Sequence, residues 1–251
     1  MTTQSSLVEI DDLAQPVDWH PVSDCPVTPV LVVMRANLSR FEAFVPHLAA
    51  CLSPAERARA DRFVRPFDQA RYVVGRGLLR QLLAGFTQQK PATVVFKPDA
   101  GKPSLAHAEG PAFNVSHSGD WIVYAFDSQP VGIDVEQVNP SFTHTDIVHS
   151  HFTLAEQQVV RENPAHFYTL WTRKEALLKA LGRGLDDDLR SVPALAGSHP
   201  LSIKPGESGG TWTVRSFVCA PQYPAALAYR KPAESREVTF YELDETVLAW
   251  C

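Results

Sequence analysis

The sequence is poor in cysteine, in long apolar runs and in excess charge of one sign. Its four cysteines, Cys25, Cys51, Cys219 and Cys251, are too scattered for a metal-binding or redox pair, so we expect a reducing, cytoplasmic environment. Apolar runs such as 30–34 are too short to span a bilayer, and the polar start lacks a signal-peptide pattern, so no membrane association is expected. With 23 basic and 28 acidic residues, the net charge of -5 argues against a nucleic-acid-binding surface.

What is present favours a folded protein of two related halves. The 45% of apolar residues can bury a core without disulfides or a structural metal. The segments SPAE from Ser53 and TLAE from Thr153 both match the capping box, in which a hydroxyl residue precedes a glutamate by three, and each predicts a helix start. A second helical pattern follows each, at 71–84 and 167–181, and each is expected to end near a glycine, Gly85 and Gly182.

Segments rich in β-forming residues follow both helical pairs. They lie at 112–115, 121–126 and 131–135 in the first half and at 211–218, 225–229 and 238–243 in the second. The proline-rich stretches 17–29 and 193–205 are expected to be loops. The repeated order predicts an α+β fold with pseudo-twofold internal duplication, divided into halves at 1–130 and 131–251.

The segment GIDVE (132–136) places two carboxylates on one face of a strand. Strand side chains alternate, so Asp134 and Glu136 lie on the face opposite Ile133 and Val135. Like charges this close are unfavourable unless a cation or a hydrogen-bond network lies between them, and a hard divalent ion is the simplest answer. The alternative is a pair of solvated acids on an exposed strand face.

The segment LWTRKEALLKAL (170–181) is a strong helix-forming sequence. Glu175 and Lys179 lie four residues apart and therefore share one face of the helix. A surface Glu-Lys pair, which needs no function, is the alternative account of these two residues.

Two further features suit phosphate groups. In FNVSHSG (113–119) an apolar strand runs into a turn that presents two serines and a histidine, and AGKP (100–103) is a turn with one cation. The stretch 57–80 carries seven arginines against two aspartates, which indicates either a solvated helical face or attraction of a polyphosphate or an acidic protein.

Taken together and in this order, FNVSHSG, GIDVE and WTRKEALLKALGRGL (171–185) resemble the signature of the 4'-phosphopantetheinyl transferases, specifically the surfactin-type (Sfp-type) group. The similarity runs from about residue 52 through 185. It implies two similar α+β halves with the active site in the cleft between them, in agreement with the repeated pattern above.

The resemblance also implies an activity. Such enzymes transfer the 4'-phosphopantetheine group of coenzyme A to a serine of an apo acyl or peptidyl carrier protein, release 3',5'-ADP and depend on Mg2+, with Mn2+ as a possible substitute. The carriers belong to fatty-acid, polyketide or nonribosomal-peptide assembly lines. A non-catalytic coenzyme A-binding module and a metal-dependent phosphohydrolase are the alternatives. A monomer is expected, because a duplicated chain already supplies both walls of a cleft.

The resemblance assigns roles at the reacting centre. Asp134, Glu136 and Glu175 match the family's three acidic metal ligands, and carboxylates with substrate phosphates are the usual ligands of magnesium. Glu175 is also the candidate base for the carrier serine, directly or through a water. Lys179 matches the lysine that meets the pyrophosphate and the departing 3',5'-ADP.

The remaining roles concern coenzyme A. His117 and Arg71 match contacts to its 3'-phosphate, Ser116 lies beside its phosphates, and the turn near the adenine is Gly101, Lys102 and Pro103. In the helix that begins after Ser53, relatives place two lysines for the 3'-phosphate, whereas Glu56 and Arg59 stand here. Arg59 and Arg71 are therefore expected to take more of that contact.

The segment 137–152 corresponds to the region that meets the carrier protein in relatives. Its apolar side chains are expected to form either a docking patch or the core of a short helix, and they are Phe142, Ile147, Val148 and Phe152.

Overall fold

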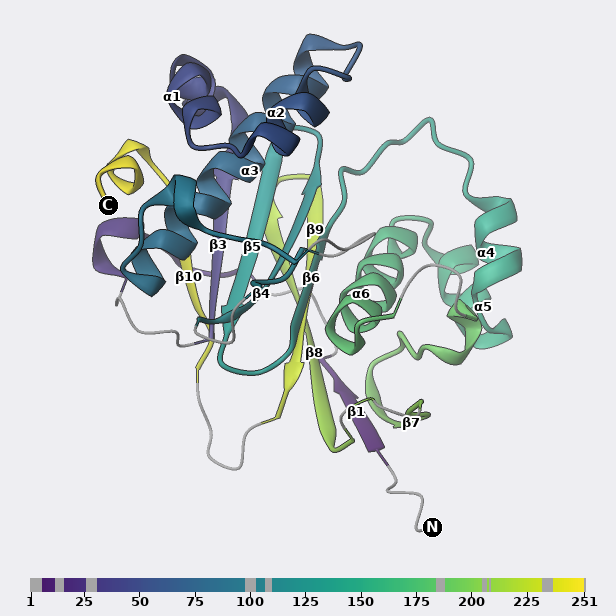
Figure 1. The fold of residues 1–251 in the computed structure, drawn as a ribbon. Helices are drawn as coiled ribbons and strands as arrows, with labels where there is room; N and C mark the ends of the chain where they lie inside the picture. Colours follow the sequence, from purple (N-terminus) through teal and green to yellow (C-terminus); the bar gives the residue numbers. More distant parts are fainter. Residues whose placement is uncertain are drawn as a thin grey trace. The chain divides into compact units, whose positions relative to one another are not determined.

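The computed structural model describes residues 6–11, 16–25, 31–97, 103–106, 110–183, 188–204, 207, 209–231 and 237–250 (Figure 1). Helices and strands are mixed, which confirms the predicted α+β class. The helices are α1 (Val45–Ala50), α2 (Pro54–Ala60), α3 (Pro66–Thr87), α4 (Thr145–His151), α5 (Leu154–Glu162) and α6 (His166–Leu181). The strands are β1 (Ser6–Ile10), β2 (Trp19–Pro21), β3 (Val32–Asn37), β4 (Ala112–Ser118), β5 (Trp121–Asp127), β6 (Val131–Val135), β7 (Gly197–Leu201), β8 (Thr211–Ala220), β9 (Tyr223–Arg230) and β10 (Thr239–Glu242). Within the described ranges, no helix is both long and apolar enough to cross a membrane.

The chain forms two compact units, and each consists of three segments that are separate in the sequence. Unit 1 comprises Met1–Val17, Phe113–Gly119 and Gln129–Glu237, and unit 2 comprises Asp18–Ala112, Asp120–Ser128 and Val238–Cys251. These units are groups of residues in contact and are not continuous in sequence. They do not test the division into the contiguous halves 1–130 and 131–251, which stays a prediction.

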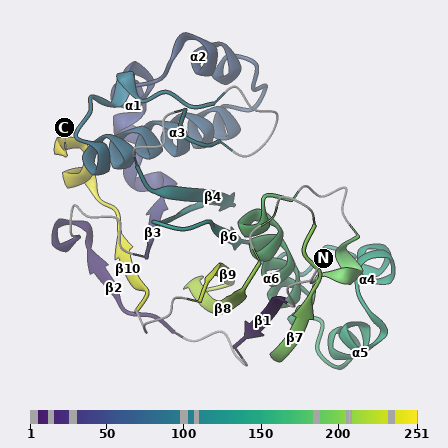
Figure 2. The same cartoon turned by 60° about the horizontal axis from the view of Figure 1, so that its bottom comes forward.

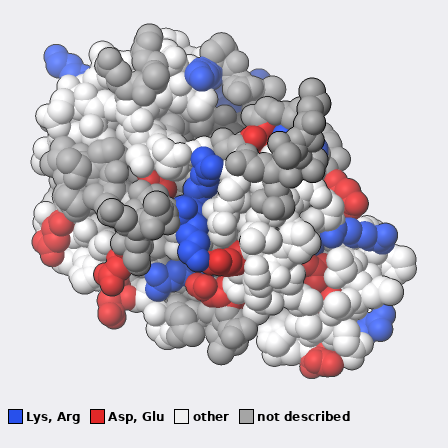
Figure 3. All heavy atoms as spheres, turned by 90° about the horizontal axis from the view of Figure 1, so that it is seen from below, with Lys and Arg blue, Asp and Glu red and all other residues white. Residues whose placement is uncertain are grey.

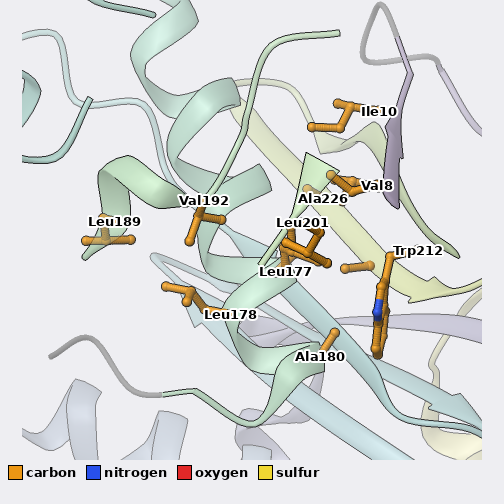
Figure 4. Close-up of a cluster of buried hydrophobic side chains, with 13 residues drawn as sticks. Val8, Ile10, Leu177, Leu178, Ala180, Leu189, Val192, Leu201, Trp212 and Ala226 are labelled. Atoms are coloured by element: carbon orange, nitrogen blue, oxygen red, sulfur yellow. The ribbon is translucent and has the colours of Figure 1, made fainter. Parts of the chain in front are cut away.

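Unit 1 is a sheet covered by α6. The strand order is β6-β9-β8-β1-β7, and the neighbours are antiparallel except for the parallel pair β1 and β8. Helix α6 packs against β6, β9 and β8 (Figure 2). Its apolar stripe, with Leu177 and Leu178, is buried together with Val8 of β1 and Trp212 of β8 (Figure 4). This packing fixes the position of α6 over the sheet.

Helix α6 and strand β6 approach one another closely at Gly132. A Cβ atom at this position would overlap the backbone carbonyl oxygen of Ala176 and the backbone nitrogen of Ala180. Glycine alone leaves this space open, because every other residue carries a Cβ. The glycine of GIDVE therefore sets the distance between the strand that carries Asp134 and the helix that carries Glu175.

Unit 2 joins strands that are distant in sequence. Strand β3 lies between β10, to which it is parallel, and β5, to which it is antiparallel, and β2 pairs with the other edge of β10. The long helix α3 belongs to this unit. Its predicted end near Gly85 is wrong, since the helix continues to Thr87 and ends at Gln88, whose φ is 52°. Gly85 is required for packing instead, because a Cβ there would lie 2.8 Å from the ring of Trp250.

The two expected capping boxes are present, one in each unit. Both capping boxes are formed: Ser53 with Glu56 at the start of α2, and Thr153 with Glu156 at the start of α5. In both, the glutamate accepts the N-cap backbone N–H at 2.8 Å and the N-cap hydroxyl accepts the glutamate N–H at 3.3 Å. The two predicted helix starts are confirmed, as is the end of α6 at Gly182, whose φ is 73°.

Each capping glutamate also pairs with a buried cation on the following long helix. Glu56 pairs with Arg80 of α3 at 2.8 Å, and Glu156 pairs with Lys174 of α6 at 3.0 Å. Each cation then donates to two carbonyls three residues apart at a short 3-10 helix. Those carbonyls belong to Pro91 and Val94 for Arg80, and to Leu189 and Val192 for Lys174. Buried charges of this kind are tolerated because they are paired and hydrogen-bonded.

Several elements depart from the expected loops. Strand β7 lies inside the stretch 193–205, and β2 lies inside 17–29. Strands β1 and β3 were not expected either. The six expected β-rich segments are confirmed as β4, β5, β6, β8, β9 and β10.

Candidate active site

Strand β6 presents the two carboxylates of GIDVE on one face. Asp134 is 4% exposed, and Glu136, just beyond the strand end, is half-buried. The account of two solvated acids on an open strand face is therefore wrong for Asp134. A buried carboxylate needs hydrogen-bond donors or a cation, so its surroundings carry chemical information.

Lys179 of α6 reaches the first carboxylate. Its Nζ lies 2.6 Å from Oδ1 of Asp134, and it also donates to the Ile133 carbonyl at 3.2 Å and to Oγ of Ser116 at 3.3 Å. The Ser116 hydroxyl, from β4, donates to the same Oδ1 at 2.7 Å. Lys179 of α6 therefore forms its ion pair with Asp134 of β6. The alternative account, a surface pair between Lys179 and Glu175, does not describe this arrangement.

The second carboxylate is held from two sides. Oγ of Ser118, at the end of β4, donates to Oε2 of Glu136 at 3.0 Å, and the side chain of Trp171 on α6 also hydrogen-bonds Glu136. Burial and the neighbouring charge of Asp134 raise the pKa of Glu136, and these two hydrogen bonds partly oppose the rise.

Glu175 is the third carboxylate, on the face of α6 that meets β6. It is 9% exposed. Burial is the main cause that raises its pKa to about 7, the charges of Asp134 and Glu136 add to the rise, and Lys179 opposes it. Asp134 therefore lies within electrostatic reach of both glutamates, and its charge disfavours the ionisation of Glu136 and of Glu175.

The donor atoms fit a hard divalent cation. Over the described part of the chain, no group of three or more His, Cys, Asp or Glu side chains is arranged to hold a metal ion. However, Oδ2 of Asp134 and Oε1 of Glu175 are both buried and have no hydrogen-bond partner among the residues that the structure describes. Oxygens of this kind are the ligands that Mg2+ prefers, and a cation there would relieve the repulsion among the carboxylates.

The two arginines expected to contact coenzyme A belong to unit 2. Arg59 of α2 is exposed, and its guanidinium lies 5.3 Å from the ring centroid of Tyr72. Arg71 of α3 is half-buried, pairs with Asp68 at 2.8 Å and lies over Phe67. Both guanidiniums are therefore positioned by neighbouring side chains.

The arginine-rich stretch 57–80 is less basic at the surface than its sequence indicates. Arg76 and Arg80 both pair with Glu56, at 3.0 and 2.8 Å, and Arg80 is buried. The capping glutamate therefore neutralises part of the stretch. Figure 3 shows a different view, from below, and on that face basic and acidic side chains also lie side by side.

The other predicted contacts are only partly described. Gly101 and Lys102 lie outside the described residues, and Pro103 is half-buried. Ser116 is buried and His117 is exposed on the following position of β4, as strand alternation requires.

A groove of about 320 Å³ lies next to the second carboxylate. Glu136 and Gln137 are among its lining residues, together with the aromatic side chains Phe142, Phe167, Tyr168 and Trp171. Ile147 also lines the groove. Phe152 is fully buried in a core cluster, against which Ile147 and Val148 pack. The segment 137–152 therefore contributes to a surface groove and to core packing, and its role as a docking patch stays a prediction.

Three residues of this site were missed by the sequence reasoning: Ser118, Trp171 and Gly132. Ser118 was recoverable, because strand alternation places it on the same face of β4 as Ser116. The contact of Trp171 with Glu136 and the close approach at Gly132 depend on the packing of α6 on β6, for which no local pattern gives a signal.

Comparison with known proteins identifies the family. The model of the 4'-phosphopantetheinyl transferase superfamily matches residues 130–228, and the model described as 4'-phosphopantetheinyl transferase, N-terminal, matches 41–129. The chain is 31% identical to the 4'-phosphopantetheinyl transferase psf-1 of Bacillus pumilus, over 77% of this chain and 85% of the relative. It is 29% identical to Sfp of Bacillus subtilis (77% and 89% covered) and 32% identical to HetI of a Nostoc species (77% and 85% covered). The chain therefore belongs to the Sfp-type group of the 4'-phosphopantetheinyl transferases, a family of enzymes that use coenzyme A to modify carrier proteins.

Proposed function

We propose that this chain transfers the 4'-phosphopantetheine group of coenzyme A to a serine of an apo acyl or peptidyl carrier protein, releases 3',5'-ADP and requires Mg2+, for which Mn2+ can substitute. The observation that carries this proposal is the meeting of two buried carboxylates, Asp134 and Glu175, with the half-buried side chains of Glu136 and Lys179 where α6 meets β6. Such a set is costly for a fold to maintain without a charged ligand.

In this proposal Asp134, Glu136 and Glu175 hold the metal ion. Support comes from the buried, unpartnered oxygens of Asp134 and Glu175. Further support is the raised pKa of Glu136 and of Glu175, which burial causes in the first place and neighbouring carboxylate charges increase. The chemistry that Mg2+ supplies in such a site is neutralisation of charge on phosphate oxygens.

Glu175 and Lys179 take the proton-transfer and charge-stabilising roles. The carrier serine oxygen forms a bond to the phosphorus that bears pantetheine, while the bond from that phosphorus to the bridging pyrophosphate oxygen breaks and its electron pair leaves with 3',5'-ADP. Glu175 accepts the serine proton, directly or through a water. Lys179 donates hydrogen bonds to the pyrophosphate and stabilises the charge that develops on the departing oxygen.

Coenzyme A contacts complete the proposal. Ser116 meets the phosphates, and Arg59, Arg71 and His117 meet the 3'-phosphate, to which a guanidinium fork is well suited. Gly101, Lys102 and Pro103 are the proposed contacts to the adenine.

The proposed internal duplication has independent support within each unit. Both capping glutamates pair with a buried cation on the next long helix, and both cations donate to a pair of carbonyls three residues apart. Two unrelated units would have no reason to repeat this arrangement. The cleft that the resemblance places between the halves, and the monomeric state, stay predictions.

The carrier protein is proposed to dock at the segment 137–152. The groove beside Glu136 supports this, since it opens next to a proposed metal ligand and is lined by the aromatic side chains of Phe142, Phe167 and Trp171. An apolar side chain of the carrier close to the modified serine would fit such a groove.

Intact-mass spectrometry of apo carrier proteins tests the proposal. A carrier incubated with this protein, coenzyme A and Mg2+ should gain the mass of one phosphopantetheine, and the gain should be lost with EDTA and in Asp134→Ala. No gain across fatty-acid, polyketide and peptide-synthetase carriers, while coenzyme A still binds, would overturn the transferase and favour the non-catalytic coenzyme A-binding module. Undiminished transfer by Asp134→Ala would refute the metal assignment.

A further inference from the structure

Three side chains of β4 meet the edge of β6 that its sheet leaves open. β6 is an end strand of its sheet, with β9 as its neighbour. Along β4, Asn114 accepts the N–H of Ile133 at 2.8 Å, Ser116 donates to Asp134 at 2.7 Å, and Ser118 donates to Glu136 at 3.0 Å. These residues alternate along β4, so their side chains lie on one face.

The two serine bonds have the same register. Each serine donates to the carboxylate that lies eighteen residues later in the chain, so the spacing of the two serines along β4 matches the spacing of Asp134 and Glu136. Both carboxylates therefore receive a neutral donor from the same strand, but their other partners differ. Asp134 has Lys179 as its cation, whereas Glu136 is held by Ser118 and Trp171.

The proton of the Ser118 hydroxyl is directed at Glu136. The backbone N–H of Gln137 donates to Oγ of Ser118 at 3.0 Å. This bond occupies a lone pair of the hydroxyl oxygen, and a hydroxyl has a single proton to donate. Because Gln137 directly follows Glu136 in the chain, Ser118 ties both the backbone and the carboxylate at this position to the end of β4.

The geometry points to Ser118 as a positioning residue that orients the Glu136 carboxylate for the divalent cation. This inference rests on the proposed function, since it takes Glu136 as a metal ligand. The hydroxyl engages Oε2 and leaves the rest of the carboxylate to the ion. Hydrogen-bond partners of metal-ligating groups commonly determine affinity in this way, by 10- to 100-fold.

The test compares Ser118→Ala with Ser118→Thr. Alanine removes the donor, whereas threonine keeps the hydroxyl. Ser118→Cys keeps a side chain of similar size with a weak donor and covers the case in which Ser118→Ala does not fold. Ser191→Ala is the matched control, because Oγ of Ser191 donates to a nearby backbone carbonyl, that of Asp188, and lies outside the segment 137–152.

The first readout is Mn2+ affinity in the presence of coenzyme A, measured from the electron paramagnetic resonance signal of free Mn2+. Ser118→Ala should bind Mn2+ about 10-fold more weakly than wild type, Ser118→Cys should be intermediate, and Ser118→Thr and Ser191→Ala should stay within about 2-fold. The second readout is transfer as a function of Mg2+ concentration. The half-saturating Mg2+ concentration should rise by a similar factor in Ser118→Ala, with most of kcat recovered at saturation.

The outcomes separate the two proposals. Wild-type Mn2+ affinity in Ser118→Ala, or a loss in Ser118→Thr as large as that in Ser118→Ala, would overturn the role of Ser118 and leave the transferase intact. A wild-type protein that neither binds Mn2+ nor transfers phosphopantetheine would overturn the proposed function, and the role of Ser118 with it.

Discussion

Substitution of Gly132 by alanine tests how α6 is held against β6. The added Cβ would overlap backbone atoms of Ala176 and Ala180, and helix backbone cannot move aside as the end of a flexible side chain can. Overpacking of a core costs about 1–3 kcal/mol, and the rigid obstacle places Gly132→Ala at the upper end, at about 3 kcal/mol. Relief of the overlap requires α6 to move on the order of 1 Å, which would carry Glu175 and Lys179 away from Asp134 and lower kcat/KM about 100-fold.

Urea unfolding and initial rates of carrier modification measure the two effects. Gly75→Ala is the matched control, because a Cβ at Gly75 in α3 would lie 3.6 Å from Ile122, an ordinary contact. That substitution should leave activity unchanged and stabilise the protein by up to about 1 kcal/mol, as alanine is the better helix former. Wild-type stability and activity in Gly132→Ala would refute the reasoning.

Three other perturbations give expected outcomes of different kinds. Lys174→Met should lower the free energy of unfolding by about 3–5 kcal/mol, because it leaves Glu156 buried without its cation, whereas Lys231→Met, at an exposed ion pair, should cost less than about 1 kcal/mol; equal losses in urea unfolding would contradict the account. In metal-free protein the pKa of Glu175 rises from 4.5 to about 7, so the folded state binds the proton more tightly and the free energy of unfolding falls as the pH rises through this range. With EDTA present, Glu175→Gln should therefore exceed wild type by about 3 kcal/mol at pH 8 and match it near pH 4; a pH-independent difference would be the wrong result. Lys179→Ala should lower kcat by about 100-fold and change the Kd of coenzyme A much less, whereas an effect confined to affinity would remove the lysine from leaving-group stabilisation.

The sequence predicted those parts of the fold that depend on local patterns. The capping boxes at Ser53 and Thr153 marked two helix starts, and the alternation in GIDVE placed two carboxylates on one face of a strand. Strands β1 and β7 were not predicted because their pairing is non-local. Strand β1, near the start of the chain, pairs with β7 and β8, which begin only at Gly197 and Thr211. Gly85 does not cap the end of α3, which continues to Thr87. A glycine is needed at position 85 because its backbone lies close to the ring of Trp250.

The site was predictable in its residue types and not in its pairing. The spacing of Glu175 and Lys179 gave their shared helix face but also allowed a surface ion pair. Only the packing of α6 on β6 directs Lys179 to Asp134 and buries Glu175. The buried pairs of Arg80 with Glu56 and of Lys174 with Glu156 were likewise beyond local patterns, since each joins two helices.

The central claim is that Asp134, Glu136 and Glu175 bind one divalent cation together with coenzyme A. Anomalous diffraction from crystals grown with Mn2+ and coenzyme A tests it most directly. The account predicts a single manganese peak about 2.0–2.2 Å from carboxylate oxygens of all three residues and from phosphate oxygens of coenzyme A. A peak elsewhere, or bound coenzyme A with no manganese at these carboxylates, would contradict it.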